Sequence, residues 1–130
     1  MNKQEKFQYW LNIANYDIKT ANAMLKSGRY LYVVFMCQQA LEKLLKGCYI
    51  LNRNGEEPPR SHNLSYLVNL LNISPTEKQS FLLDRLTAFY IQGRYPTYKQ
   101  RLSKIIKKPE ATILLKQTKE MYRWLISQAK

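Results

Sequence analysis

Apolar side chains recur every three or four residues along most of this chain, and that spacing is the strongest restriction on its fold. In the first segment the series is Phe7, Trp10, Leu11, Ala14, Ile18, Ala21 and Leu25. Strict alternation of apolar and polar residues, which a half-buried strand requires, is absent throughout. With only 4 Gly and 5 Pro among 130 residues, the composition also disfavours a turn-rich β fold. The spacing therefore predicts an all-α protein.

The first half of the chain divides into three helices and one loop. Gly28 ends the first helix in the manner of a C-terminal glycine. Residues 30–51 are apolar on nearly every side, which is typical of a helix in the middle of a bundle. The segment 52–60 contains Gly and two Pro and is expected to be a loop, and a short helix is expected over 64–71.

Turn signals place the remaining helices. Ser74-Pro75-Thr76-Glu77 has the pattern of a capping box with proline at the first helical position. The helix that it opens is expected to stop near Gly93, before Pro96, and the last helix to begin around Pro109. The sequence thus predicts a single domain over 1–130, an antiparallel up-and-down bundle of four long helices plus one short helix.

The charge of the chain is high and unevenly placed. There are 21 Lys and Arg against 9 Asp and Glu, a formal net charge of +12. Residues 93–130 hold ten of the basic residues and two glutamates, which gives +8 for that segment. Such an excess favours a polyanionic partner such as nucleic acid, a nucleotide or an acidic protein, whereas evenly spread charge would favour a solubilising surface.

The two cysteines and the start of the chain bear on its location. Cys37 and Cys48 would be separated by about 16 Å along one helix, too far for a disulfide. We expect buried free thiols, as in proteins of a reducing compartment. The start of the chain does not resemble a signal peptide, and the longest apolar run is too short to span a bilayer. The expected location is cytoplasmic, with no membrane association.

Few residues could carry chemistry. His62 is the only histidine, and a single histidine beside a helix start is more often a capping or packing residue than a catalyst. No metal site is expected because one histidine and two distant cysteines do not make a ligand set. The chain has no glycine-rich phosphate loop, and we expect no cofactor.

Two polar clusters are candidates for a binding site. Gln39, Lys43 and Lys46 form a stripe on the central helix, which is expected to face a groove or a second subunit, although Glu42 and Lys46 could also form an ordinary ion pair. Arg94 and Tyr95 lie in a tyrosine-rich segment over 90–98. They precede the basic residues Lys99, Arg101, Lys104, Lys107 and Lys108, with no acidic residue between. Tyrosines beside cations could stack bases and neutralise phosphates, or the tyrosines could simply be half-buried in a turn.

Five segments occur in a fixed order along the chain: Tyr16-Asp17-Ile18-Lys19-Thr20-Ala21, Gly28-Arg29-Tyr30, the run from Cys37 to Lys46, His62-Asn63-Leu64 and Tyr90-Ile91-Gln92-Gly93-Arg94-Tyr95-Pro96. Together these segments resemble the HEPN family (higher eukaryotes and prokaryotes nucleotide-binding). The resemblance implies a helical bundle, usually dimeric and often encoded beside a minimal nucleotidyltransferase in toxin–antitoxin pairs. Some members are metal-independent ribonucleases, and others are nucleotide-binding or non-catalytic partners.

The chain departs from the ribonuclease members of that family. Those members have an arginine followed, after four to six residues, by a histidine. The arginine that matches here is Arg94, but the expected histidine positions are Lys99, Gln100 and Arg101. Acid–base cleavage through that motif is therefore not expected, and no catalytic residue is assigned.

Three hypotheses follow. The first is a binding subunit for a nucleotide or RNA, whose groove contains Gln39, Lys43, Lys46, His62, Arg94 and Tyr95, and which pairs with a nucleotidyltransferase. The second is a ribonuclease that uses Arg94 with His62 or a lysine, and the third is a basic helical scaffold for a protein partner. A homodimer is also expected, because Tyr9, Trp10 and the apolar excess of residues 30–51 exceed what a small bundle readily buries.

Overall fold

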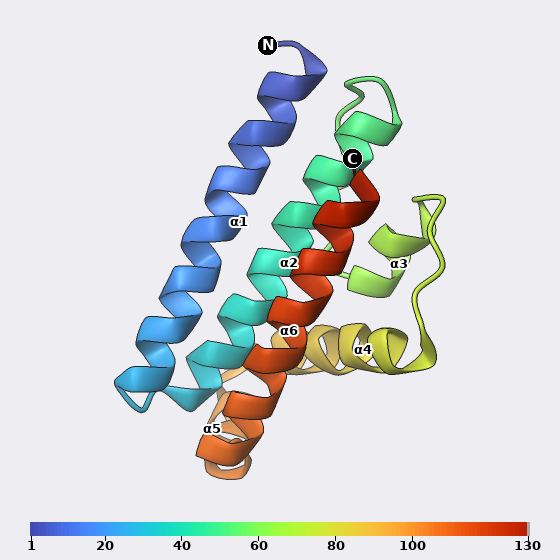
Figure 1. The fold of residues 1–130 in the computed structure, drawn as a ribbon. Helices are drawn as coiled ribbons and strands as arrows, with labels where there is room; N and C mark the ends of the chain where they lie inside the picture. Colours follow the sequence, from blue (N-terminus) through green and yellow to red (C-terminus); the bar gives the residue numbers. More distant parts are fainter. Residues whose placement is uncertain (130) are drawn as a thin grey trace.

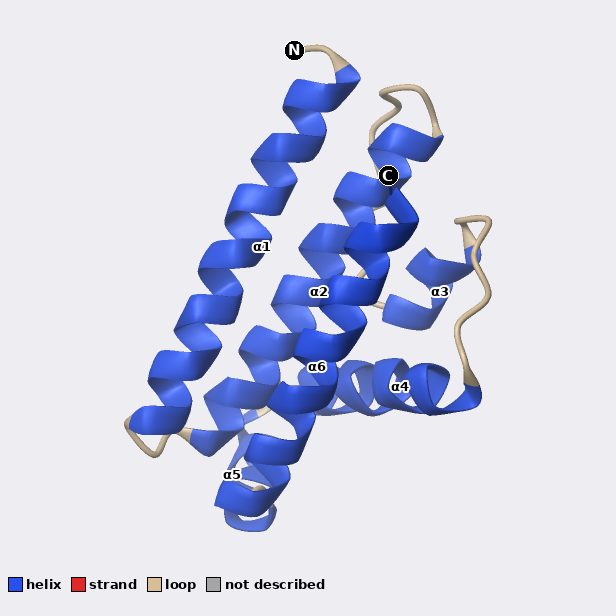
Figure 2. Ribbon diagram, in the orientation of Figure 1, coloured by secondary structure: helices blue, strands red, loops and turns tan. Residues whose placement is uncertain are grey.

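The computed structural model describes residues 1–129, and these residues form six α-helices with no strand among them. The helices are α1 (Lys3–Lys26), α2 (Tyr30–Asn52), α3 (Leu64–Asn69), α4 (Glu77–Gln92), α5 (Pro96–Ile105) and α6 (Lys108–Ala129). Figure 1 shows α1, α2 and α6 side by side as the long axis of the molecule, with α4 crosswise to α2 and α6 on the side away from α1. The predicted all-α bundle is confirmed (Figure 2).

Helix α2 is the centre of the bundle, as its all-round apolar sequence predicts. It packs against each of the other five helices, and most of its side chains are buried. Leu41, Leu44 and Leu45 are completely inaccessible to solvent, and they contribute to a core shared with α4 and α6. Burying such side chains stabilises the fold by about 1.5–3 kcal/mol each.

The boundaries of α1 follow from its caps. Asn2 accepts a hydrogen bond from the backbone N–H of Glu5, and the Glu5 side chain accepts one from the N–H of Asn2, which together form a capping box. The helix ends before Gly28, whose φ of +76° is in the left-handed region that glycine adopts without strain. The expected end at Gly28 is therefore confirmed, and the chain turns there directly into α2.

Two details of the sequence prediction are wrong. The cap of α4 is Thr76, which forms a capping box with Gln79, so Ser74 and Glu77 are not the pair and Pro75 is not the first helical residue. The segment 96–105, for which the sequence predicts no helix, is a helix, α5. Pro96 does not only end the preceding helix: it occupies the first turn of α5, where its missing N–H has no cost.

Side-chain contacts fasten the outer helices to the bundle. Arg85 of α4 pairs with Glu110 of α6, and Lys119 of α6 donates to Asn22 of α1 at 2.7 Å. The short helix α3 is attached to α4 through Thr87, whose hydroxyl accepts from the N–H of Leu64 at 3.1 Å. Among the helices described, none combines the length and the hydropathy needed to cross a membrane.

Candidate functional site

Glu42, in the middle of α2, is the centre of a buried polar network. Nδ1 of His62 lies 2.8 Å from its Oε1, and Lys46 donates from Nζ to its Oε2 at 3.0 Å. Gln38 donates to Oε1 at 3.1 Å and to the backbone carbonyl of His62 at 2.9 Å. The side chain of Glu42 is only 6% exposed, so these partners replace water around the carboxylate. The network holds the loop before α3 against α2.

The network continues along α2 to α1. Gln39 donates to Oε1 of Gln38 at 2.8 Å and accepts from Nζ of Lys43 at 3.1 Å. Lys43 also donates to Oδ2 of Asp17 at 2.7 Å, and Asp17 is buried in the face of α1 that packs on α2. Polar side chains of α1 and α2 are thus joined to His62 in one chain of contacts.

The charges in this network determine how Glu42 ionises. Burial raises the pKa of the Glu42 carboxyl, but hydrogen bonds from His62, Gln38 and Lys46 lower it by more, so the pKa lies below its ordinary value of 4.5. Glu42 is therefore ionised at neutral pH and balances the charge of Lys46. A carboxylate on Nδ1 also fixes the orientation of the imidazole, as in other carboxylate–histidine pairs.

His62 connects the buried network to the surface. Its side chain is 46% exposed although one ring nitrogen is held by Glu42. The neighbouring Asn63, rather than His62, caps α3, because its side chain accepts from the N–H of Tyr66. The His62 ring lies 5.3 Å from the ring of Tyr90 in the last turn of α4. His62 is thus a packing residue on one side and an accessible imidazole on the other.

A row of aromatic rings runs from His62 to helix α5. The ring of Tyr90 lies 6.1 Å from that of Phe35, which lies 5.6 Å from that of Tyr32, both in edge-on geometry. Nζ of Lys99 lies 5.0 Å from the centre of the Tyr32 ring. The row links the polar network of α2 to the basic surface of α5.

Gly93 allows this row to form at the end of α4. A Cβ at this position would lie 2.5 Å from Cε1 of Phe35 and closer still to Cζ, which is inside van der Waals contact. The φ of Gly93 is −68°, so the requirement is space and not backbone freedom. The chain turns here into Arg94, Tyr95 and α5.

Helix α5, the turns on either side of it and the start of α6 contain the basic residues that the sequence groups together. We call Arg94, Lys99, Arg101, Lys104, Lys107 and Lys108 the basic surface. All except Lys99, which is half-buried, are exposed, and none forms a salt bridge with another described residue. The ring of Tyr98 lies 6.4 Å from that of Tyr95 and 5.4 Å from Cζ of Arg101. Two exposed tyrosines therefore lie beside the cations at the start of this helix.

The structure brings together only some of the site residues that the sequence predicts. Gln39, Lys43, Lys46 and His62 lie in one connected network, but the two lysines are paired with Asp17 and Glu42 inside the bundle. Arg94 and Tyr95 lie on the exposed turn beyond Tyr90.

The ordinary ion pair of Glu42 with Lys46, which the sequence gives as an alternative, is confirmed at 3.0 Å. The sequence does not predict the roles of Gln38 and Asp17. A carboxylate such as that of Glu42, on a helix that is otherwise core, requires a partner. Its contact with His62 could not be found from local spacing, because the two residues are 20 apart in the sequence.

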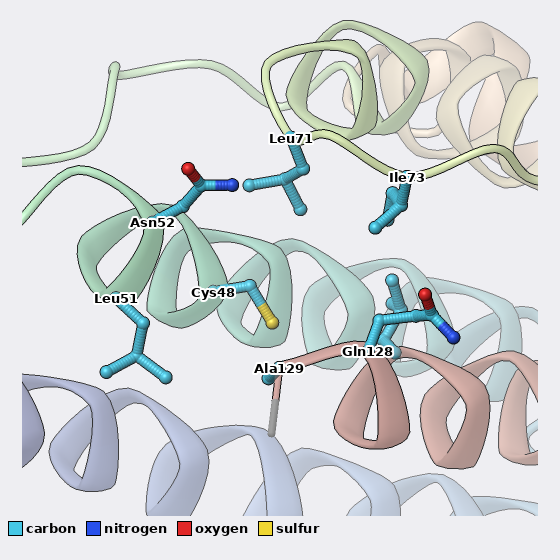
Figure 3. A pocket seen from close by; sticks show the side chains of 8 residues that line it. Cys48, Leu51, Asn52, Leu71, Ile73, Gln128 and Ala129 are labelled. Carbon is cyan, nitrogen blue, oxygen red and sulfur yellow. The ribbon is translucent and has the colours of Figure 1, made fainter.

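Two further features lie outside this network. Cys37 and Cys48 are buried free thiols, as expected, and burial raises the pKa of each to about 12. Cys48 lines a pocket of about 170 Å³ with Leu71, Gln128 and Ala129 (Figure 3). That pocket lies at the opposite end of the bundle from α5 (Figure 1). Within residues 1–129, no group of three or more His, Cys, Asp or Glu side chains could hold a metal ion.

Comparison with known proteins identifies the class of this helical bundle. The family model for the HEPN domain matches residues 7–128, so the chain belongs to the HEPN domain family. The protein TT1696 from Thermus thermophilus has a similar fold, with a TM-score of 0.78 and 22% identity over 94% of this chain and 97% of that one.

ST0689, an archaeal HEPN homologue, is similar with a TM-score of 0.75 and 20% identity, over 96% of this chain and 98% of its own. At these identities the two structures support the fold alone. A comparison with curated proteins found no match.

Proposed function

We propose that this HEPN protein is a binding subunit for a nucleotide or RNA, and that it pairs with a minimal nucleotidyltransferase in a toxin–antitoxin-like system. The observation that carries the proposal is the basic surface on and around α5, whose six cations have no carboxylate partner among the described residues. Unpaired cations within one short segment favour phosphate groups, since no internal charge must be displaced when they bind.

The roles of the individual residues follow from their positions. Arg94 and Tyr95 are exposed at the start of α5, where a guanidinium can hold a phosphate in two places and a tyrosine can stack on a base. His62 presents a half-exposed imidazole on the same aromatic row. Gln39, Lys43 and Lys46 support the site by holding His62 and α1 in place, because their polar groups are engaged inside the bundle.

Salt dependence tests this function. If three or four residues of the basic surface contact phosphates, log affinity for single-stranded RNA should fall with log salt at a slope of roughly −2 to −3. Arg94→Ala should weaken binding more than Lys104→Ala, because arginine can hold phosphate in bidentate geometry. Lys116→Ala, an exposed lysine of α6, is the matched control and should change little. Absence of binding at low salt would contradict the proposal and favour an acidic protein partner for this surface.

We further propose that the protein does not cleave RNA, because no histidine follows Arg94 at the spacing of the ribonuclease members. A second candidate function, metal-independent ribonuclease, is favoured by one observation: Glu42 orients the imidazole of His62, which is the arrangement of a general base. Incubation with total RNA and with tRNA, without metal, should leave both intact. Cleavage that disappears in His62→Ala would instead establish the ribonuclease.

We also propose that the protein is a homodimer. The apolar residues of α2 do not contribute, because α2 is covered within one chain. The support comes from α1, where Tyr9 and Tyr16 are exposed and, seven residues apart, lie on one face of the helix. Exposed aromatic side chains on one helix face are typical of protein–protein contacts.

A further inference from the structure

A groove lies between the turn that joins α1 to α2 and the side of α5. Its volume is about 320 Å³, at the lower end of the range of about 300–1,000 Å³ for small-molecule sites. One wall consists of Gly28, Arg29, Tyr30, Leu31 and Tyr32, and the other of Lys99, Gln100, Ser103 and Ile106. Only Lys99 of these residues belongs to the basic surface, so the groove is a separate feature of the molecule.

The charged side chains of this groove are all cationic. Arg29 and Lys99 face it from opposite walls, and no carboxylate is among its lining residues. Arg29 is exposed and forms no salt bridge with the described residues. Two cations on facing walls, without an acid between them, produce a positive potential that attracts an anion into the space.

Lys99 is held in place only weakly. Its ammonium lies 5.0 Å from the centre of the Tyr32 ring, and it forms no salt bridge with the described residues. A charge-assisted hydrogen bond to a phosphate is stronger than such a cation–π contact. A phosphate that enters the groove can therefore draw Lys99 from the ring, and the ring face then becomes available.

The groove also offers a flat aromatic surface. Tyr32 is 41% exposed, and its ring packs perpendicular to that of Phe35 at a ring distance of 5.6 Å. An exposed ring that is anchored by a neighbouring ring suits the stacking of a base once Lys99 has moved. Gln100 and Ser103 supply polar side chains beside it.

We propose that this groove binds one nucleotide unit, with the phosphate between Arg29 and Lys99 and the base against Tyr32. A free mononucleotide and a single unit of an RNA strand share this chemistry. The inference rests on the proposed function, because Lys99 is common to both surfaces, and adds Arg29 and Tyr32 from a different part of the fold.

The direct test is to titrate the labelled protein with adenosine 5′-monophosphate and follow its backbone amide signals by NMR. We expect shifts concentrated at residues 28–32 and 99–106. Adenosine, which lacks the phosphate, should bind about tenfold or more weakly, as loss of one charge-assisted contact predicts. Inorganic phosphate should shift the signals of Arg29 and Lys99, and it should shift Tyr32 less than adenosine 5′-monophosphate does, because it only withdraws Lys99 from the ring and places no base on it. Shifts that are absent, or spread evenly over all exposed basic residues, would overturn the proposal.

Two variants test separately the phosphate contact of Arg29 and the base contact of Tyr32. Arg29→Gln should weaken binding of the mononucleotide about tenfold, and Tyr32→Leu, which retains apolar bulk but removes the ring, at least about fivefold. Lys116→Gln is the control and should bind like the wild type. Circular dichroism checks that each variant retains its helices. A folded Tyr32→Leu protein should bind adenosine 5′-monophosphate only as well as the wild type binds ribose 5-phosphate, which lacks the base. If all variants bind adenosine 5′-monophosphate as tightly as the wild type does, the proposed nucleotide site is wrong.

An RNA titration distinguishes failure of this site from failure of the proposed function. If single-stranded RNA binds and depends on Arg94 and Lys104 but not on Arg29 or Tyr32, the groove proposal is wrong and the proposed function stands. If adenosine 5′-monophosphate occupies the groove while RNA does not bind, the groove is a mononucleotide site and the role of the basic surface in RNA binding is wrong.

Discussion

Replacing Glu42 by glutamine tests whether its carboxylate is the anion that holds the polar network together. The substitution preserves the size of the side chain and one carbonyl oxygen but removes the charge. Nζ of Lys46, which donates to Glu42 at 3.0 Å, would then be left without a carboxylate at a position where the lysine is only 8% exposed. His62 and Gln38 would lose their charged acceptor at the same time.

The size of the effect follows from the burial of this pair. Removing one partner of a buried ion pair costs about 3–5 kcal/mol, because the other charge remains uncompensated. We expect the lower end, about 3 kcal/mol, because Lys46 also lies 6.0 Å from the ring centre of Trp10 and retains some exposure. For 130 residues, an unfolding entropy of about 2.1 cal/mol/K per residue converts this loss into a melting temperature roughly 11 °C lower.

Urea denaturation at pH 7 measures the free energy of unfolding in a double-mutant cycle of Glu42→Gln, Lys46→Met and the double variant. The double variant should be destabilised by at least about 1 kcal/mol less than the sum of the single variants, since it leaves no unpaired charge. If Glu42→Gln remains within about 1 kcal/mol of the wild type, Glu42 is not the anion that anchors the network.

The same variant has a defined pH dependence. Hydrogen bonds from His62, Gln38 and Lys46 outweigh burial and hold the pKa of Glu42 below 4.5 in the folded protein. The ionised carboxylate therefore stabilises the fold above the pKa of the unfolded chain, and this contribution is lost as the pH falls through the lower pKa of the folded state. The difference in unfolding free energy between wild type and Glu42→Gln should narrow as the pH is lowered from 7 to below 4.5. A difference that stays constant would refute the assignment.

Two further predictions concern packing and assembly. Gly93→Ala should destabilise the protein by about 1–3 kcal/mol, because the new methyl group overlaps the Phe35 ring, and Phe35→Leu in the same chain should recover part of the loss in thermal unfolding. An equal loss in both backgrounds would show that the ring is not the obstacle. Sedimentation equilibrium at micromolar concentration should give twice the 15.5 kDa chain mass, and Tyr9→Lys with Tyr16→Lys should shift it toward one chain. A wild-type protein that sediments only at 15.5 kDa is incompatible with the dimer.

The fold class and most of the helices could be predicted from the sequence alone. Spacing of apolar residues is a local property, and it placed α1, α2, α3, α4 and α6 and put α2 at the centre. It did not find α5, although Tyr98, Leu102 and Ile105 have helical spacing, because the helix is short, mostly polar and buries only Leu102. Its proline was consistent with either a helix stop or a helix start.

The partners of the polar side chains, in contrast, depend on how the helices pack. The stripe of Gln39, Lys43 and Lys46 is visible in the sequence. Whether its side chains face solvent or an acidic side chain depends on which residues of α1 and of the loop before α3 pack on α2. Asp17 lies 26 residues from Lys43, and His62 lies 20 residues from Glu42. The energy of a buried charge depends on the partners within a few ångströms, and helix packing brings these partners together at separations far longer than one helical turn.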